Sequence, residues 1–354
     1  MKSHGNLFAE ICALENMHWA ARKARRRKTR KIYVEDFDLH RERFVAQLRA
    51  EMLAGVYRPR GYRNFYIHDP KKRLISAAPY RDRVVHHALC NVLEPLLQRR
   101  FVLDSYSCQR DKGTTAAHER CRYYTNRYGY VLKCDIQKFF QSVDQRILMD
   151  KLERIIRCRP TLALCGLILD SYHDEEVPPI HFPGDGLFTP HARRRGLPIG
   201  NLTSQIWANF YLDRMDHHIK EKLRAPAYAR YTDDWLLWSD DKGFLHACQG
   251  ALTELLQTER LRLHPVKTRI MACREGVPFL GFRFFPGHAP RLLGTTKRRF
   301  ERRTRRQWAA YCAGLFPFEK LRVSAFGWTQ FSRYGNVKGL LAAYLKSGFG
   351  RAGL

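Results

Sequence analysis

Residues 228–240 read YARYTDDWLLWSD and place two adjacent carboxylates, Asp233 and Asp234, between runs of Tyr, Trp and Leu. Apolar runs on both sides of a short polar turn predict a β-hairpin that rests on a packed core. Asp is a common turn residue, so the pair has an ordinary structural explanation. Two carboxylates held close on such a surface nevertheless repel each other and raise each other's pKa unless a cation compensates them. The stretch therefore indicates a cation site.

Magnesium fits this site best, because it prefers hard oxygen ligands and keeps positions open for water and phosphate. A site for two ions needs a third carboxylate. Residues 130–136 alternate in the pattern of a strand, and Asp135 lies near its end. Two Mg²⁺ ions roughly 3.5–4 Å apart could activate a 3′-hydroxyl and stabilise a leaving pyrophosphate. We expect two Mg²⁺ ions as cofactors, with Mn²⁺ able to substitute.

The charge of the chain predicts a polyanionic partner. Its 354 residues include 63 Lys and Arg against 34 Asp and Glu, which gives a net charge of +29. Nucleic acid is the first candidate partner and an anionic membrane surface the second. Solubility alone does not require such a large excess of basic over acidic residues. Basic runs at 22–31 and 297–307 flank the apolar middle of the chain.

Apolar runs and cysteine usage predict a cytoplasmic protein that is not in a membrane. The longest apolar run, LALCGLIL at 162–169, is well under the roughly 20 residues that a membrane span needs. The first residues contain no continuous apolar region of the kind that a secretion signal has. The ten cysteines form no CxxC pair, which argues against a zinc ribbon or a disulfide framework and favours reduced thiols.

The remaining pattern predicts a mixture of helices and strands. We expect helices over 6–24, 81–97, 143–156 and 243–261, a glycine-containing turn that enters a long helix within 196–223, hairpins over 63–78 and 277–287, and a helical C-terminal part. Asp144 is a candidate N-cap. Residues 157–196 are rich in Pro, His and Gly and predict an insertion or long loop. A metal site in that insertion is an alternative to a polar surface, but no two of its histidines have i, i+4 spacing.

Four motifs, taken in their order along this basic chain, resemble those of reverse transcriptases. YTDD at 231–234 resembles the family's Tyr-X-Asp-Asp signature, and DIQKFFQSVD at 135–144 resembles the palm motif with the first metal-binding Asp. PVKT at 265–268 resembles the motif whose lysine is proposed to protonate pyrophosphate, and FLGFRF at 279–284 resembles the primer-grip hairpin. The resemblance implies that Lys267 is catalytic and that the metal is bound by Asp135, Ile136, Asp233 and Asp234.

The resemblance covers about 63–284 and implies an α+β, right-hand polymerase fold with fingers, a ferredoxin-like palm and a helical thumb. The boundaries it implies are an N-terminal basic helical region over 1–62, fingers over 63–130, a palm over 131–290 with an insertion at about 157–196, and a basic helical thumb over 291–354. Such an enzyme is an RNA-directed DNA polymerase. Its partners are a template RNA, a primer, the cDNA product and dNTPs.

Basic residues in the fingers and thumb are candidates for contacts with phosphate. Lys71, Lys72 and Arg73 lie at the tip of the 63–78 hairpin and could contact the triphosphate, Arg73 through a bidentate fork; the alternative is a solvated turn. Arg83 could line the template. Four further candidates for the template and primer are Gly281 in the primer-grip motif and Lys297, Arg298 and Arg302 in the thumb.

Phe140 is the candidate that decides between DNA and RNA synthesis. The position five residues after the first metal-binding Asp contacts the sugar of the incoming nucleotide in this family, and related RNA polymerases usually place an Asp there. An aromatic ring cannot satisfy a 2′-hydroxyl and would clash with it, so Phe140 favours dNTPs. The alternative is that Phe139 and Phe140 both belong to the core; one of an adjacent pair must face the other way.

IGNLTSQ at 199–205 is similar to the motif of diversity-generating retroelement reverse transcriptases. Group II intron and many related enzymes instead carry Gln-Gly-X-X-X-Ser-Pro at this position. Those enzymes copy a template RNA with errors at adenines, and a small accessory protein and a structured RNA would then be partners. Gly200 and Gln205 would meet the nucleotide, and Ile199 the template. A Gln at position 199 could hydrogen-bond to the nucleotide or template, whereas Ile199 cannot. The loss of that hydrogen bond would loosen nucleotide selection. An unchanged cDNA error rate in Ile199→Gln would contradict this hypothesis.

Three other readings of the chain stay open. Bacterial antiphage-defence reverse transcriptases share similar palm motifs, and a group II intron-derived enzyme is the third member of the same class. A protein of another class, a polymerase fold that only binds RNA, is disfavoured because all the predicted catalytic side chains are present. Primer extension on an RNA template separates this last reading from the others.

Overall fold

The computed structural model describes residues 5–26, 28–29, 31–68, 72–337 and 339–340. The chain forms two compact units. The first unit consists of Met1–Asp111, Asp135–Arg224 and Cys248–Pro265; the second consists of Lys112–Cys134, Ala225–Ala247 and Val266–Leu354. None of the described helices is both long enough and apolar enough to cross a membrane.

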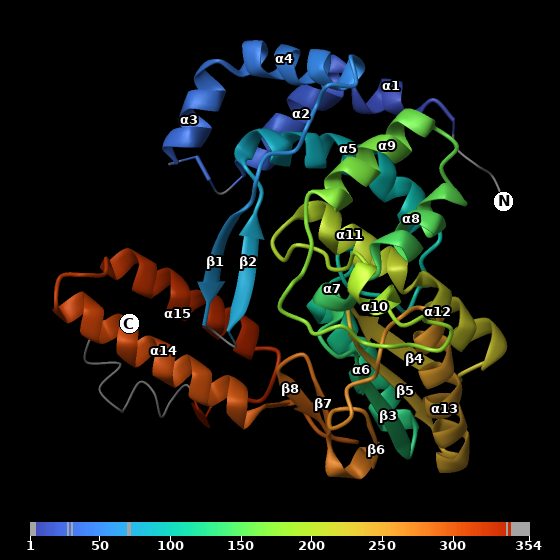
Figure 1. The fold of residues 1–354 in the computed structure, drawn as a ribbon. Helices are drawn as coiled ribbons and strands as arrows, with labels where there is room; N and C mark the ends of the chain where they lie inside the picture. Colours follow the sequence, from blue (N-terminus) through green and yellow to red (C-terminus); the bar gives the residue numbers. More distant parts are fainter. Residues whose placement is uncertain (1–4, 27, 30, 69–71, 338, 341–354) are drawn as a thin grey trace. The chain divides into compact units, whose positions relative to one another are not determined.

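The N-terminal part of the first unit is a layer of short helices packed on one long helix. α2 (Leu14–Arg25) lies along α5 (Tyr80–Gln98), which is the predicted helix over 81–97 (Figure 1). α1 (Leu7–Ile11), α3 (Ile32–Leu39) and α4 (Arg41–Leu53) complete this layer. Met17 and Ala20 of α2 and Val84 of α5 are fully buried, so the contact is apolar.

The single helix predicted over 6–24 is wrong, because the chain breaks at Cys12–Ala13 between α1 and α2. Ala13 has ψ of 134°, which no helix allows. Side chains satisfy the carbonyl groups that the break frees: Asn16 Nδ2 donates to the carbonyl of Ile11 at 2.9 Å, and Arg49 Nε donates to that of Cys12 at 2.9 Å. Contacts with the layer therefore override the local helical preference.

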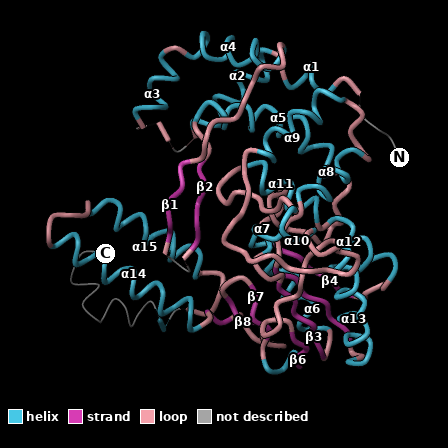
Figure 2. Tube along the Cα trace, in the orientation of Figure 1, coloured by secondary structure: helices cyan, strands magenta, loops and turns pink. Residues whose placement is uncertain are grey.

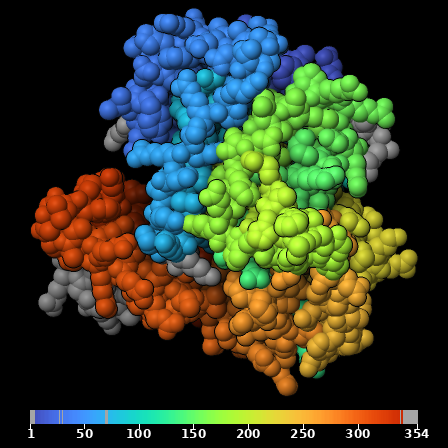
Figure 3. Space-filling model, viewed as in Figure 1, coloured from blue at the N-terminus to red at the C-terminus, as the bar shows by residue number. Residues whose placement is uncertain are grey.

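The hairpin predicted over 63–78 is confirmed. β1 (Arg63–Ile67) pairs antiparallel with β2 (Arg73–Ala77), and the first unit is otherwise mostly helical (Figure 2). The side chains of β1 are exposed along most of the strand, and the light-blue atoms of this hairpin lie at the surface (Figure 3). Tyr66 Oη donates to Glu176 Oε1 at 2.6 Å, so the hairpin contacts the 157–196 segment.

The rest of the first unit carries the segments around the predicted motifs. Its helices are α7 (Phe139–Ser142), α8 (Gln145–Glu153), α9 (Arg159–Asp170), α10 (Thr189–Ala192), α11 (Leu202–Tyr211), α12 (Asp213–His217) and the π-helix η1 (His218–Lys222). Asp144 caps α8 as predicted, accepting hydrogen bonds from the backbone N–H groups of Arg146 and Ile147 at 3.0 Å. α11 packs on α5.

The prediction that 157–196 is a loop is only partly right, because the segment contains α9 and α10. The apolar run at 162–169 forms the buried face of α9, with Leu164, Cys165, Ile168 and Leu169 inside. Pro160 occupies the first turn, where a missing N–H costs nothing. The residues after α9 are held by Asp185, whose buried carboxylate contacts both Arg193 and Arg260.

Replacing Asp185 with Asn should strongly destabilise the first unit. The carboxylate is fully buried between two guanidinium groups, and removing one partner of a buried ion pair costs about 3–5 kcal/mol. Urea unfolding measures the loss. Asp170→Asn is the matched control, since Asp170 is 71% exposed beside Arg194 and its pair should contribute under about 1 kcal/mol. Equal losses in the two variants would contradict this assignment.

The second unit is built on a four-stranded sheet with strand order β4-β5-β3-β6, in which β4 pairs antiparallel with β5 and β3 pairs antiparallel with β6. Its strands are β3 (Tyr130–Asp135), β4 (Ala227–Tyr231), β5 (Asp234–Ser239) and β6 (Arg269–Ala272). α6 (Thr114–Arg127) packs against β4 and β5, and α13 (Lys242–Thr258) follows β5. Trp235 and Trp238 are fully buried, which explains the apolar residues of the 228–240 stretch.

A second, three-stranded sheet and a helix pair complete this unit. The sheet consists of β7 (Val277–Phe279), β8 (Phe282–Phe284) and β9 (Arg291–Leu292), so the predicted hairpin over 277–287 is present. α14 (Gly294–Cys312) and α15 (Phe318–Ser332) run side by side (Figure 1). The rings of Phe300 and Trp328 stack between them at 3.8 Å. The fold is α+β; its division into fingers, palm and thumb stays a prediction.

Candidate functional site

The two adjacent carboxylates occupy different positions in the hairpin. Tyr231 pairs with Asp234, so Thr232 and Asp233 form the turn and Asp234 begins β5. The side chains of 231–234 are half-buried, whereas Trp235 is fully buried. The hairpin therefore presents both carboxylates at the border between the core and solvent.

Thr232 holds this turn in an uncommon backbone conformation. Its φ is +58°, which is an outlier for a β-branched residue. Such strain persists only where the surroundings hold it, and it is concentrated at functional sites. Arg230, which is fully buried, donates from Nη1 to the carbonyl of Thr232 at 3.1 Å. The sequence analysis did not single out Arg230; a lone Arg inside an apolar strand was the available signal.

Lys133 is a second residue that the sequence analysis missed. Its Nζ donates to both carboxylate oxygens of Asp234, at 2.7 and 3.0 Å, and to the carbonyl of Pro278 at 3.0 Å. Lys133 lies two residues before Asp135, and side chains at i and i+2 share one face of a strand. The Lys133 ammonium therefore compensates part of the negative charge of the two adjacent carboxylates.

Asp135 is the last residue of β3, as predicted, and its backbone is tied down in the first unit. Its carbonyl accepts from the N–H of His264 at 2.7 Å, and Gln137 N–H donates to the carbonyl of Arg262 at 2.9 Å. Ile136 is buried and forms an isolated bridge with Leu263. These contacts fix where the strand ends and therefore where the Asp135 carboxylate starts.

Phe139 and Phe140 differ in burial. Phe139 is 2% exposed, whereas Phe140 is half-buried, and their rings lie 5.6 Å apart at 71°. The pair lies in the short helix α7 rather than in a strand, and successive helical side chains also point in different directions. Phe139 is thus a core residue. Leu197 N–H donates to the carbonyl of Phe140 at 2.7 Å, which ties α7 to the segment before Ile199.

The glycine turn before α11 packs against the β1–β2 hairpin. The carbonyl of Ile199 accepts from the N–H of Ser76 at 3.1 Å. Gly200 has φ of +116°, and a Cβ there would lie 3.1 Å from Ile75 Cγ2, so this position requires glycine. Gln205 is exposed, and its Oε1 accepts from Cys108 Sγ at 3.6 Å.

The basic candidates are spread over both units. In the first unit, Lys72 lies 4.3 Å from the ring of Tyr66, Arg73 begins β2, and Arg83 Nε donates to the carbonyl of Ala78 at 2.7 Å. Lys71 lies outside the described residues. In the second unit, Lys267 is half-buried in a turn before β6.

The thumb candidates lie on α14 and beside α15. Arg298 and Arg302 are exposed and spaced i, i+4, so they share one face of α14, while Lys297 is half-buried. Gly281 has φ of +93°, and a Cβ there would lie 2.9 Å from Phe331 Cζ of α15. This glycine lets the β7–β8 hairpin approach the helix closely.

Each unit therefore brings together a part of the predicted site. The second unit gathers Asp233 and Asp234 with Lys133. The first unit places Arg83, Gly200 and Gln205 around one cavity of about 200 Å³. Within the ranges that the structure describes, no group of three or more His, Cys, Asp or Glu side chains is arranged as a metal site. Metal binding by these carboxylates is therefore a matter for proposal.

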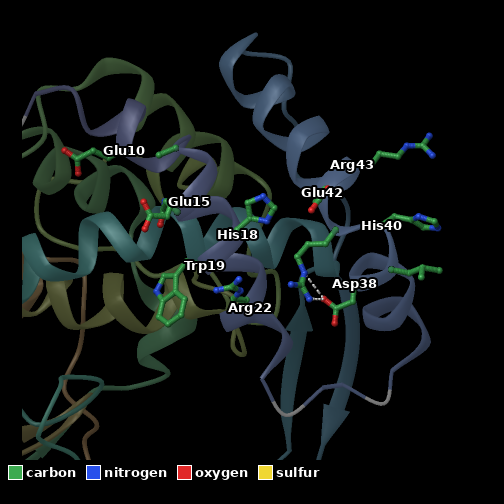
Figure 4. Close-up of a pocket in the computed structure, with 13 residues that line it drawn as sticks. Glu10, Glu15, His18, Trp19, Arg22, Asp38, His40, Glu42 and Arg43 are labelled. Carbon is green, nitrogen blue, oxygen red and sulfur yellow. Dashed lines mark hydrogen bonds and ion pairs between the residues drawn. The ribbon is translucent and has the colours of Figure 1, made fainter.

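A larger cavity, of about 1220 Å³, lies in the N-terminal layer of the first unit (Figure 4). His18, Trp19 and Arg22 of α2 line one side, and residues of the turn from α3 to α4, such as His40, line the other. Its lining carries both acidic and basic side chains, and Arg41 pairs with Asp38 there at 2.7 Å. None of the sequence-predicted site residues lines it, so size alone does not identify the functional site.

Comparison with known proteins places the motifs in one family. A family model described as "Reverse transcriptase (RNA-dependent DNA polymerase)" matches residues 67–284, which is more than half of the chain. The matched range begins in β1 and ends in β8, so it contains Asp135, the 228–240 hairpin and Lys267.

Individual relatives are distant. Protein YkfC of Escherichia coli is 25% identical over 279 residues, which cover 67% of this chain and 70% of YkfC. A COX1/OXI3 intron 2 protein of Saccharomyces cerevisiae is 22% identical over 42% of this chain, but only 16% of that protein is covered. The nuclear intron maturase 1 of Arabidopsis thaliana is 26% identical over 28% of this chain and 14% of its own length.

Among solved structures, telomerase from Candida albicans in complex with a fragment of telomeric RNA is similar to this chain. Its TM-score is 0.46 at 15% identity, with 67% of this chain and 46% of that chain covered.

Proposed function

Because this chain belongs to the reverse transcriptase family, we propose that it is an RNA-directed DNA polymerase that extends a primer along a template RNA. The observation that carries the proposal is the Tyr-X-Asp-Asp turn between β4 and β5, inside the segment that the family model matches. The net charge of +29 supports a polyanionic substrate.

The donor set of the carboxylates fits Mg²⁺. Asp135, Asp233 and Asp234 offer hard oxygen ligands at strand ends, and no thiolate or imidazole is part of the proposed set. Asp135, Asp233 and Asp234 would be the ligands, with the main chain of Ile136 beside them, and Lys133 already donates to Asp234 in this structure. When bound, two ions would activate the 3′-hydroxyl and stabilise the leaving pyrophosphate.

The chain's own side chains supply the remaining steps. Arg73 and Lys72 of the hairpin would hold the triphosphate, and Lys267 Nζ would give a proton to the leaving pyrophosphate. The ring of Phe140 would pack against the sugar and exclude a 2′-hydroxyl. Gly200 would let the backbone approach the new base pair, and Arg298 and Arg302 of α14 would grip the duplex backbone.

Lys133 is proposed as a positioning residue for Asp234. We expect Lys133→Met to lower kcat about 10–100-fold with little change in the KM for dNTPs, because displacing a positioned carboxylate by about 1 Å can cost that much. Lys133→Arg, which keeps the charge, should recover most of kcat. Steady-state primer extension with an Mg²⁺ titration measures both values. Wild-type kcat in Lys133→Met would contradict the role.

Within the family, we propose the diversity-generating retroelement type, in which cDNA synthesis is error-prone at template adenines. The support is Ile199-Gly200 with Ser204-Gln205, together with the tight packing of Gly200 on β2. A small accessory protein and a structured RNA would be partners. An intron-derived enzyme is the second candidate, and the similarity to intron proteins favours it; an antiphage-defence enzyme is the third.

Primer extension on an adenine-containing RNA template with Mg²⁺ tests both levels of the proposal. Extension with dNTPs but not rNTPs supports the polymerase. Sequencing the cDNA then separates the types: errors concentrated opposite adenines support the retroelement type, and accurate copies favour the intron-derived or defence enzyme. No extension on any template, with or without added Mn²⁺, would contradict the polymerase proposal.

A further inference from the structure

The cavity of about 200 Å³ in the first unit is built from three distant segments. α5 contributes Arg83, His86 and His87; the turn and first residues of α11 contribute Gly200, Asn201, Leu202 and Gln205; and Lys28 comes from the basic run after α2. Since a water molecule takes about 30 Å³ of liquid, the space holds roughly six waters or one small polar group.

The charge around this cavity is of one sign. Among the described residues that line it, the titratable ones are Lys28, Arg83, His86 and His87, and none of them is acidic. Lys23 and Arg26 also face His87. Burial, followed by the positive charge of Arg83, lowers the pKa of Lys28. Burial first, and then neighbouring cationic groups, lower the pKa of His86 to about 3 and that of His87 to about 4. The cavity is thus short of negative charge.

Buried polar atoms around the cavity lack partners. His86 is 2% exposed, and its Nδ1 has no hydrogen-bond partner among the described residues. His87 Nδ1 is in the same position. Asn201 also lines the cavity but is already paired, because its Oδ1 accepts from the N–H of Ala78 at 3.5 Å and its side chain hydrogen-bonds to Tyr62. Buried polar atoms are normally paired, so two unpartnered imidazole nitrogens beside one basic cavity indicate a missing anionic acceptor.

From these observations we propose that the cavity binds one phosphate group of a nucleic-acid strand, a phosphodiester held by Lys28, Arg83 and His87. Gly200 adds no side chain that would block the approach. Lys28 continues a basic run that includes Arg22, Lys23, Arg25 and Arg26, and a strand rather than a free nucleotide would contact such a run. This inference rests on the proposed function, which supplies the RNA.

Binding of a short single-stranded RNA to the full chain, measured by fluorescence anisotropy across a salt series, tests the site without catalysis. Lys28→Gln should weaken binding roughly tenfold for any sequence and reduce the salt slope by about 0.7, the value for one phosphate of a single strand. Lys31→Gln is the matched control, since Lys31 is exposed in the same run and does not line the cavity. Equal losses in the two variants would overturn the proposal.

Protonation of His87 provides a second readout, which does not depend on removing the charge of Lys28. Burial and the positive charges of Lys23, Lys28, Arg26 and Arg83 lower the pKa of His87 to about 4. A bound phosphate should raise that pKa. RNA affinity should therefore rise as pH falls from 7.5 to 5.5. His87→Gln should flatten this rise. An unchanged pH dependence in that variant would overturn the proposal.

Histidine-labelled protein distinguishes the source of the phosphate. The ring signals of His86 and His87 should move on adding inorganic phosphate or RNA. Movement with dTTP but not with RNA would overturn the assignment to a strand, and no movement with either would overturn the site. These measurements do not require primer extension. If the polymerase assay failed while RNA binding was intact, the proposed function would be contradicted and the phosphate site would still be supported.

Discussion

Asp233→Asn should reduce primer extension by about 1000-fold or more while the protein stays folded. Asp233 lies in the two-residue turn between β4 and β5 and is half-buried, so its carboxylate is held at the border of the core rather than in free solvent. An amide keeps the size of the side chain but removes the charge that a hard cation requires. Losing several kcal/mol of transition-state stabilisation gives a loss of this size, since about 1.4 kcal/mol is tenfold in rate.

Asp240→Asn is the matched control, because it makes the same change at the other end of β5. Asp240 Oδ1 accepts from the N–H of Gly129 at 2.7 Å, and an amide oxygen can accept the same hydrogen bond. Asp240→Asn should therefore keep near-wild-type extension, and thermal unfolding checks that both variants fold. More than a tenth of wild-type activity in Asp233→Asn would overturn the carboxylate assignment.

The elements next to the motifs were predictable because their signals are local. The 228–240 hairpin, the end of β3 at Asp135 and the N-cap of α8 each depend on residues within a few positions. Alternation, turn chemistry and capping act over that range, so the sequence is sufficient there. Gly200 differs from these elements: its φ of +116° requires glycine, but its contact with the nucleotide stays a prediction.

The errors arose where distant contacts decide the structure. Arg49 takes the carbonyl of Cys12 from 37 residues away, and this supports a break that no local residue signals. Lys133 meets Asp234 across 101 residues, so strand alternation could show its face but not its partner. α9 was hidden because the composition of 157–196 as a whole outweighed eight apolar residues within it. The basic cavity beside His86 is lined by three distant segments and has no sequence signal.

Phe140→Ala should allow the enzyme to use rNTPs. In the proposed site a 2′-hydroxyl would meet the ring of Phe140, where it would clash or lose its hydrogen bonds, at about 1–3 kcal/mol for the unpaired group alone. The variant should therefore raise the ratio of rNTP to dNTP kcat/KM by about 10–100-fold, chiefly by admitting the ribose. Single-nucleotide primer extension with matched dNTP and rNTP pairs measures the ratio.

Phe139→Leu separates this gate from a general loosening of the core. Phe139 is 2% exposed beside the half-buried Phe140, so the substitution leaves a space in the core and should lower stability. It should not change the preference for dNTPs, because the ring that it alters is enclosed. If the preference for dNTPs shifted in Phe139→Leu but not in Phe140→Ala, the assignment of the gate to Phe140 would be wrong. Equal shifts in both would mean that packing around α7, rather than contact with the sugar, sets the choice of nucleotide.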